Sequence, residues 1–389
     1  MKIKNQISEL IEAEVISTDV ATNIEAYYAS KATDKDSRLF LIFGVIGAVL
    51  VGLGLILIMA HNWDEMTVWL KVGIAFTPLV LGQLLCVFSI FYKSNSAAWK
   101  QSSAMFLFLS IGGCISLISQ IYNIPGEITS FIFVWMILAL PIIYMMPSSI
   151  VSLMYLYGTG YYATQSGTWS EYADVNYKFW ILLGLVLPYY LYISRSYKNK
   201  LLTIFHHWAI PVVLAVGLLM ALSSLDPLLS IVFISLFGIY YMIGHIDYFR
   251  ENALRANAYL VYGSLSTVIF LFVASFTDFW KHITRDNFFV TDGIFSSLEG
   301  LVVIITVLIA CVLMSYLMSK RRYQDYKPIF FAYFMFVILY LLDIGPFASG
   351  IIVNVFLLII GLTTVKEGVD RNHVGISVRL KIKIAIFRF

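Results

Sequence analysis

The chain has 389 residues, of which 60% are hydrophobic and only 13% are charged. Soluble domains are about 25% charged and about 45–50% apolar, so the composition excludes an ordinary soluble protein. The cysteines Cys86, Cys114 and Cys311 lie inside apolar runs and have no metal-ligand spacing. They therefore predict buried thiols and exclude a disulfide framework and a zinc site.

The first segment, residues 1–38, is polar and precedes any long apolar run. Apolar residues repeat at helical spacing on both sides of residues 15–19, where Ser17 or Thr18 can cap a second helix. This pattern predicts a cytoplasmic helical hairpin. Five basic and seven acidic residues give it a net negative charge, so it is a poor nucleic-acid binder, because such binding requires neutralised phosphates. We expect a docking or self-association module.

Twelve apolar segments follow, and runs of about 18 or more apolar residues are typical of transmembrane helices. The segments are 39–60, 72–91, 103–121, 130–146, 147–164, 178–193, 205–222, 227–244, 258–276, 295–318, 328–342 and 346–365. The fold class predicted is an all-α polytopic membrane protein with about 12 transmembrane helices, forming a bundle over residues 39–365. The two tyrosine-rich segments, 147–164 and 178–193, are the weakest, and whether they fully cross the membrane is left open.

The distribution of lysine and arginine predicts the orientation, because these residues gather in cytoplasmic loops. With both termini inside, the inner segments hold 22 basic and 12 acidic residues, and the outer segments hold 3 basic and 11 acidic residues. The inner face is therefore positive, which suits an anionic inner leaflet. An acidic outer face would concentrate cations, although acidic residues are also simply tolerated there.

The last segment, residues 366–389, is a basic amphipathic cytoplasmic tail. Between residues 374 and 386, branched apolar residues alternate with polar ones that include Arg379, Lys381 and Lys383. A period of two predicts a strand with an apolar face and a cationic face. We expect this strand to lie on anionic lipid at the inner surface of the bilayer, or else to pair with a second chain.

Polar residues gather where the spans are predicted to reach the outer surface. The first apolar run ends abruptly in the sequence His61-Asn62-Trp63-Asp64-Glu65. These polar residues at the outer ends of the spans, the outer mouth, could bind a cation or a polar solute. Alternatively, they cap helix ends and orient loops. The candidate outer-face cluster consists of His61, Asn62, Asp64, Glu65, Gln120, Tyr122, Glu127 and Asp343.

Polar residues inside the spans are few. Gln83, Gln120 and Asn354 are the notable amides, and no acid lies near the middle of a span, which argues against an ion-coupled pump. His206 and His207 are adjacent, so they diverge by about 100° on a helix, and we interpret them as anchors at the inner interface. The sequence lacks nucleophile-elbow, P-loop, HExxH and CxxC motifs, and we expect no catalytic residue, no metal and no cofactor.

Several stretches, in this order, carry a resemblance: "LIEAEVISTDVATNIEAYY", "RLFLIFGVIGAVLVGLGLILIMAHNWDEM", "SLISQIYNIPGE" and "FVWMILALPIIYMMPSSIVSLMYLYG". Over about residues 8–165 the chain resembles the "domain of unknown function 2157" family of predicted bacterial membrane proteins. His61 departs from the alanine of the family pattern. The resemblance implies a bacterial cytoplasmic (inner) membrane location and brings no known activity, substrate or cofactor.

Three classes of function remain open. We favour a non-catalytic envelope or scaffold protein whose residues 1–38 recruit a protein partner or a second copy. The first alternative is a transporter or channel-like protein that uses the acidic outer mouth for a cation or small polar solute. The second is an intramembrane enzyme that acts on a lipid-linked substrate. A solvent-connected cavity would favour either alternative over a scaffold.

Overall fold

A computed structural model of the chain describes residues 13, 15, 17–24, 63–166, 177–198, 200–222, 227–250, 253–283, 298–320 and 327–370. The chain divides into two compact units, Met1–Ile74 and Ala75–Phe389. The predicted span 39–60, the first helix of the predicted hairpin and the strand predicted over residues 374–386 all lie outside the described residues.

The first unit includes a short helix over residues 18–24 and the beginning of α3. The backbone N–H of Val20 donates to the Ser17 hydroxyl at 3.4 Å, so of the two predicted caps, Ser17 and Thr18, it is Ser17 that caps this helix. A turn over residues 63–66 precedes α3, and the Lys71 ammonium lies 5.4 Å from the centre of the Trp63 ring. This cation–π contact holds the lysine beside Trp63.

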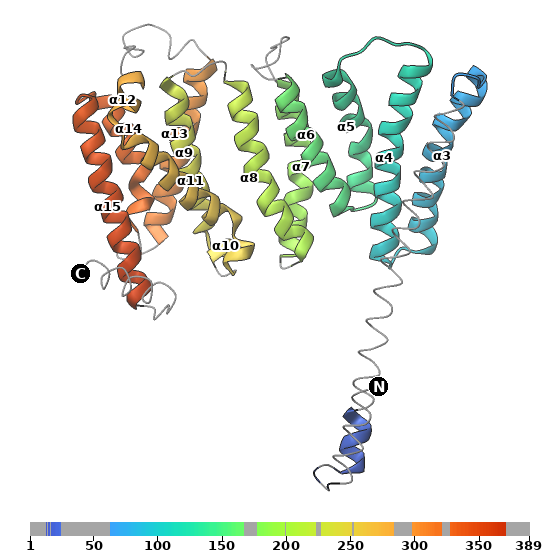
Figure 1. Cartoon of the computed structure of the whole chain (residues 1–389), viewed down its shortest axis with the longest axis horizontal. Coiled ribbons are helices and arrows are strands. Elements are labelled where there is room, and N and C mark those ends of the chain that lie inside the picture. Colours follow the sequence, from blue (N-terminus) through green and yellow to red (C-terminus); the bar gives the residue numbers. More distant parts are fainter. Residues whose placement is uncertain are drawn as a thin grey trace. The chain divides into compact units, whose positions relative to one another are not determined.

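Every regular element in the described residues is a helix, which confirms the all-α class (Figure 1). The elements are α3 (Val68–Tyr92), α4 (Ala97–Ile121), α5 (Ile128–Met145), α6 (Ser149–Ser166), α7 (Tyr177–Ser196), α8 (Leu201–Ala221), α9 (Pro227–Gly244), α10 (Asp247–Arg250), η1 (Leu254–Ala256), α11 (Ala258–Ala274), α12 (Thr277–Ile283), α13 (Leu298–Lys320), η3 (Pro328–Phe331), α14 (Ala332–Leu342) and α15 (Pro346–Asp370). Each span predicted from residue 72 onward overlaps one of these helices. The last helix continues to Asp370, into the segment assigned to the tail.

Seven helices in the described part of the chain are long and apolar enough to cross a membrane, and an eighth results if a bent pair counts as one span. The seven are α3, α4, α5, α7, α8, α13 and α15. The apolar stretches 229–244 and 328–342 are shorter, and α6 is an 18-residue helix of lower hydropathy. The chain is therefore a multi-span helical membrane protein, and the count of about twelve spans stays a prediction.

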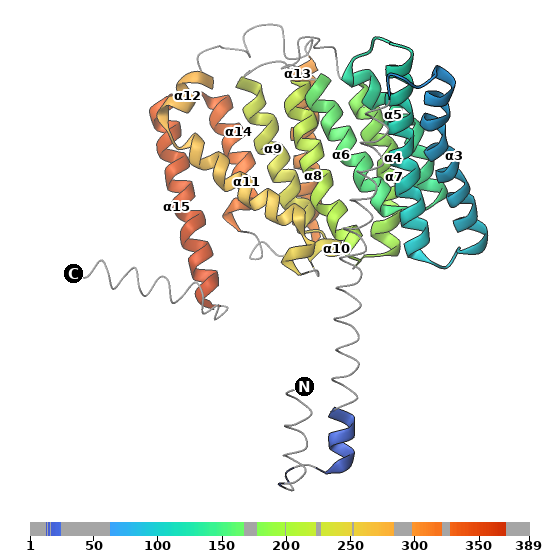
Figure 2. The same cartoon turned by 45° about the vertical axis from the view of Figure 1, so that its right-hand side comes forward.

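In the second unit, each of two helices, α6 and α9, packs on several others. Helix α6 packs on α5 and α8, while α9 packs on α11, α13 and α14 (Figure 2). Helix α11 crosses α9 where Gly263 faces the backbone of Tyr241, with no room for a β-carbon. Small residues allow such close approach between membrane helices.

Asn257 joins the ends of three helices, α9, α10 and α11. Its amide donates to the carbonyls of Gly244 and Phe249, while its oxygen caps α11.

Helix α11 does not continue as the single span predicted over residues 258–276. It ends at Ala274, and α12 leaves at an angle of 89°. The break frees backbone carbonyls, which are costly in an apolar environment unless they are paired. The buried Trp280 indole donates to the Ala274 carbonyl at 2.6 Å, and the Asn354 amide of α15 donates to the Ser275 carbonyl at 3.0 Å. One nearby side chain, Trp280, and one distant in sequence, Asn354, thus stabilise the bend.

Candidate functional site

The turn between α4 and α5 holds three residues of the predicted outer cluster, Gln120, Tyr122 and Glu127. Helix α4 ends because Asn123 adopts a left-handed conformation with φ 47°. The backbone N–H of Ile124 then donates to the Ser119 carbonyl at 2.9 Å, a bond typical of a Schellman helix end. The Ser119 hydroxyl donates in return to the Ile124 carbonyl at 3.0 Å. The chain therefore leaves α4 along a fixed path.

A groove of about 750 Å³ lies along this turn, and Gln120 and Glu127 both line it. Ser116, Ser119 and Ser130 contribute hydroxyl groups to the same groove. The Glu127 carboxylate accepts a hydrogen bond from the Thr129 hydroxyl at 3.2 Å and does not cap α5. The groove therefore presents one carboxylate, one amide and several hydroxyls, a set suited to a small polar or cationic solute.

The other predicted cluster residues lie elsewhere or outside the described residues. His61 and Asn62 are not described, and Asp64 and Glu65 are exposed on the turn before α3, in the first unit. The remaining two belong to the second unit but do not line the groove: Tyr122 is exposed at the end of α4, and Asp343 ends α14 in a left-handed conformation. A single outer site formed by all eight residues stays a prediction.

A second polar group lies near the predicted inner ends of α6, α7 and α8. His206 is completely buried, and its Nδ1 lies 2.7 Å from the Leu202 carbonyl. Because a carbonyl only accepts, Nδ1 must carry a proton. In the neutral ring, Nε2 then accepts from the buried Ser152 hydroxyl at 3.0 Å. This bond joins α8 to α6.

The neighbouring His207 is also completely buried but faces different helices. Its Nδ1 lies 2.8 Å from the Tyr190 hydroxyl of α7, which lies 3.1 Å from the Tyr259 hydroxyl of α11. His207 Nε2 has no hydrogen-bond partner in the described part of the chain, and the ring packs edge-on against Phe249 at 5.0 Å. Three helices thus meet at a linear chain of polar groups.

The histidines are not interface anchors, and the prediction to that effect is wrong. Adjacent histidines point in different directions on a helix, as expected, but both directions here lead into the protein rather than to its surface. The next residue, Trp208, is half-buried, and its indole donates to the Arg255 carbonyl at 3.0 Å. One signal in the sequence points to buried histidines: tyrosines lie near the predicted inner ends of α7 and α11, where their hydroxyls can serve as hydrogen-bond partners of a histidine.

Tyr248 of α10 borders this network outside the spans. Its hydroxyl donates to the Ser194 carbonyl at 2.8 Å. Burial raises the pKa of Tyr248 above its ordinary value, and the side chain of Ser194 opposes the rise. The hydroxyl therefore stays protonated at neutral pH and acts as a fixed donor to the end of α7.

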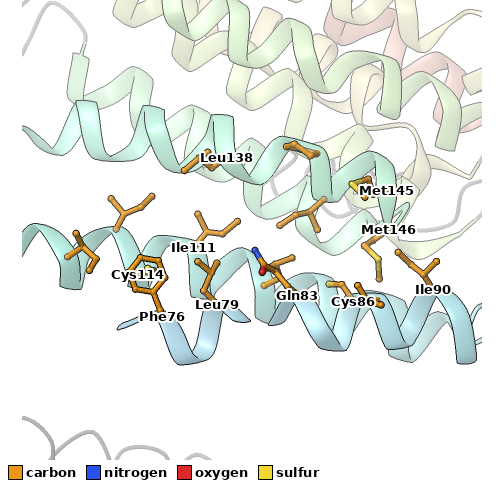
Figure 3. A pocket seen from close by; sticks show the side chains of 16 residues that line it. Phe76, Leu79, Gln83, Cys86, Ile90, Ile111, Cys114, Leu138, Met145 and Met146 are labelled. Atoms are coloured by element: carbon orange, nitrogen blue, oxygen red, sulfur yellow. The ribbon is translucent and has the colours of Figure 1, made fainter. Parts of the chain in front are cut away.

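A large apolar cavity of about 650 Å³ lies between α3, α4 and α5 (Figure 3). Its walls are almost entirely aliphatic, with the thiols of Cys86 and Cys114 and the amide of Gln83 as the polar exceptions. Both cysteines are buried and free, as predicted, while Cys311 is free but only half-buried. The cavity is lined by Phe76, Leu79, Gln83, Cys86, Val87, Ile90, Leu107, Ile111, Cys114, Ile115, Ile118, Leu138, Pro141, Ile142, Met145 and Met146.

A third, smaller cleft of about 190 Å³ lies between α10 and α13, lined by Asp247, Arg250 and Lys320 among others. The described residues contain no group of three or more histidine, cysteine or acidic side chains that could hold a metal ion.

Long apolar helices, polar groups bonded between helices and a large apolar cavity define a multi-span membrane protein. Residues 8–152 match the model of the family described as "Predicted membrane protein (DUF2157)". This match confirms the resemblance found in the sequence and includes every residue that lines the apolar cavity. No curated protein and no solved structure matches the chain.

Proposed function

We propose that the chain is a non-catalytic scaffold of the bacterial inner membrane, with both termini in the cytoplasm. The observation that supports this proposal is that several of its intramembrane polar side chains bond one helix to another. His206 bonds to Ser152, Tyr190 bonds to His207, and the Trp135 indole donates to the Phe108 carbonyl at 2.9 Å. Such bonds oppose sliding of one helix along another, which suits a protein that holds its shape.

In this proposal, the two ends of the chain provide the contacts. Residues 1–38 would dock on a protein partner or on a second copy, because their apolar stripes need a cover that the segment itself is too short to supply. The basic tail would lie on anionic lipid of the inner leaflet, where each lysine or arginine contributes about 1 kcal/mol. The membrane bundle would fix the position of both.

The experiment compares the full chain with a variant that lacks residues 1–38, both extracted from their native membranes in mild detergent. A scaffold predicts that the full chain migrates in a larger complex than the shortened one on a native gel. Equal migration of monomeric forms would contradict the docking role. Deletion of the basic residues of the tail provides the matched control, since it should leave the complex intact.

A second candidate is a transporter or channel-like protein for a cation or small polar solute, and the groove with Gln120 and Glu127 favours it. Purified protein in liposomes would be tested for uptake of rubidium ions. The scaffold proposal predicts uptake no faster than in empty liposomes. Saturable uptake that is lost in Glu127→Gln would overturn the scaffold proposal and support transport.

A further inference from the structure

The apolar cavity between α3, α4 and α5 contains a single amide, that of Gln83. Gln83 lies nine residues before the end of α3 at Tyr92, which is roughly 13 Å along the helix axis. A glutamine side chain is too short to bring its amide to the membrane surface from that depth. The amide therefore remains in the apolar part of the bilayer.

An amide in this position requires a hydrogen-bond partner. Leaving it unpaired in an apolar medium costs on the order of 2–7 kcal/mol, depending on the reference state. Within the described part of the chain, the Gln83 side chain has no hydrogen-bond partner. The missing partner therefore comes from another molecule or from residues that are not described.

The position of the side chain restricts what that partner is. The Gln83 side chain lies on α3 among the residues that line the cavity, and it is exposed, so the cavity is open beside it (Figure 3). Beside it, Gly82 allows α3 to approach α4 closely, because a β-carbon there would lie 3.1 Å from the Cα of Leu107. A molecule inside the cavity would reach the amide directly.

We propose that this cavity binds an uncharged long-chain lipid with one hydrogen-bonding head group, of the isoprenoid quinone class. The aliphatic walls suit the chain, and the absence of any charged residue among the lining side chains disfavours a charged head group. The Gln83 N–H would donate to a quinone carbonyl. A volume of about 650 Å³ is in the range of about 300–1,000 Å³ that ligand sites usually have.

The test uses the full-length protein in detergent with decylubiquinone as the probe and dodecylbenzene, which lacks oxygen atoms, as the matched control. Decylubiquinone should raise the unfolding temperature in a saturable manner, because a ligand that binds only the folded state stabilises it. Gln83→Leu should weaken this binding about tenfold, as expected for loss of one hydrogen bond in an apolar site. Dodecylbenzene should bind equally to both proteins.

The three free cysteines locate the bound probe. Cys86 and Cys114 line the cavity and Cys311 lies on α13, so decylubiquinone should slow maleimide labelling of the first two and leave Cys311 unchanged. If Gln83→Leu folds poorly, Leu138→Trp provides a second variant, because it fills the cavity from a half-exposed position and should abolish protection.

Several results would overturn the proposal. One is no stabilisation by decylubiquinone, and another is stabilisation by decylubiquinone that is no larger than that by dodecylbenzene and is unchanged in Gln83→Leu. A third is a change of oligomeric state in Gln83→Leu without any effect of the quinone, which would assign the amide to a contact between copies. All of these would leave the scaffold proposal untouched.

Discussion

The Tyr190 hydroxyl lies 2.8 Å from Nδ1 of His207 and 3.1 Å from the Tyr259 hydroxyl, so one side chain joins α7 to both α8 and α11. All three side chains are buried. In an interior of low dielectric constant, such bonds are strong and the loss of a partner is costly. The network is therefore a place where single substitutions have large effects.

Tyr190→Phe should destabilise the protein by about 1–3 kcal/mol, because it leaves two buried polar groups with one partner fewer. His207→Phe should have a similar effect. The double variant should lose less than the sum of the two, since removing both partners leaves no unpaired group between them. Reversible unfolding in mixed micelles measures all three. Strict additivity would show that the two groups do not interact.

The break between α11 and α12 should depend on Trp280. Trp280→Phe keeps most of the buried ring but removes the donor to the Ala274 carbonyl, and should cost about 1–3 kcal/mol. Trp69→Phe is the matched control, since Trp69 is 85% exposed and its replacement should have little effect. The thermal unfolding midpoint in detergent compares them. Equal midpoints for the two variants would mean that the indole bond contributes nothing to the bend.

Gly263→Ala should destabilise the contact between α9 and α11. A β-carbon at this position would meet the backbone of Tyr241, which cannot move aside as a flexible side chain would. Overpacking of this kind typically costs about 1–3 kcal/mol. At Gly113 on α4 no described residue lies within 4 Å of the place that a β-carbon would take, so Gly113→Ala should be neutral or slightly stabilising. A neutral Gly263→Ala would disprove the close approach.

Both ends of the chain should lie in the cytoplasm. The prediction rests on 22 basic residues in segments assigned inside against 3 in segments assigned outside. Green fluorescent protein should fluoresce when fused to either end, and alkaline phosphatase fused there should be inactive. An active phosphatase at the Phe389 end would require an odd number of spans.

The basic tail should bind anionic membranes. A peptide of residues 371–389 should bind vesicles that contain phosphatidylglycerol at low salt and bind neutral vesicles less, because Arg379, Lys381 and Lys383 carry the attraction. Added salt should weaken binding by screening. Replacing the three cations with glutamine should remove the preference for anionic vesicles. If the preference for anionic vesicles persists in this variant, the attraction is not electrostatic.

The sequence by itself determined the class of this protein and the approximate place of its helices. Apolar runs of about 18 residues or more predict spans because the bilayer requires a minimum length, and from residue 72 onward each predicted span overlaps a helix. The Ser17 cap was also predictable, because capping depends on neighbours in the chain. These are local properties, and hydropathy or short-range spacing is enough to reveal them.

Only the tertiary structure decided where the polar side chains point. Apolar runs show that a helix is buried in lipid or protein but not which face meets which neighbour. For this reason His206 and His207 were assigned to the interface, although Ser152 and Tyr190 bond to them inside. Likewise, residues 258–276 form a single apolar run, and the bend after Ala274 depends on Trp280 and on Asn354, a partner 79 residues beyond Ser275 in the chain.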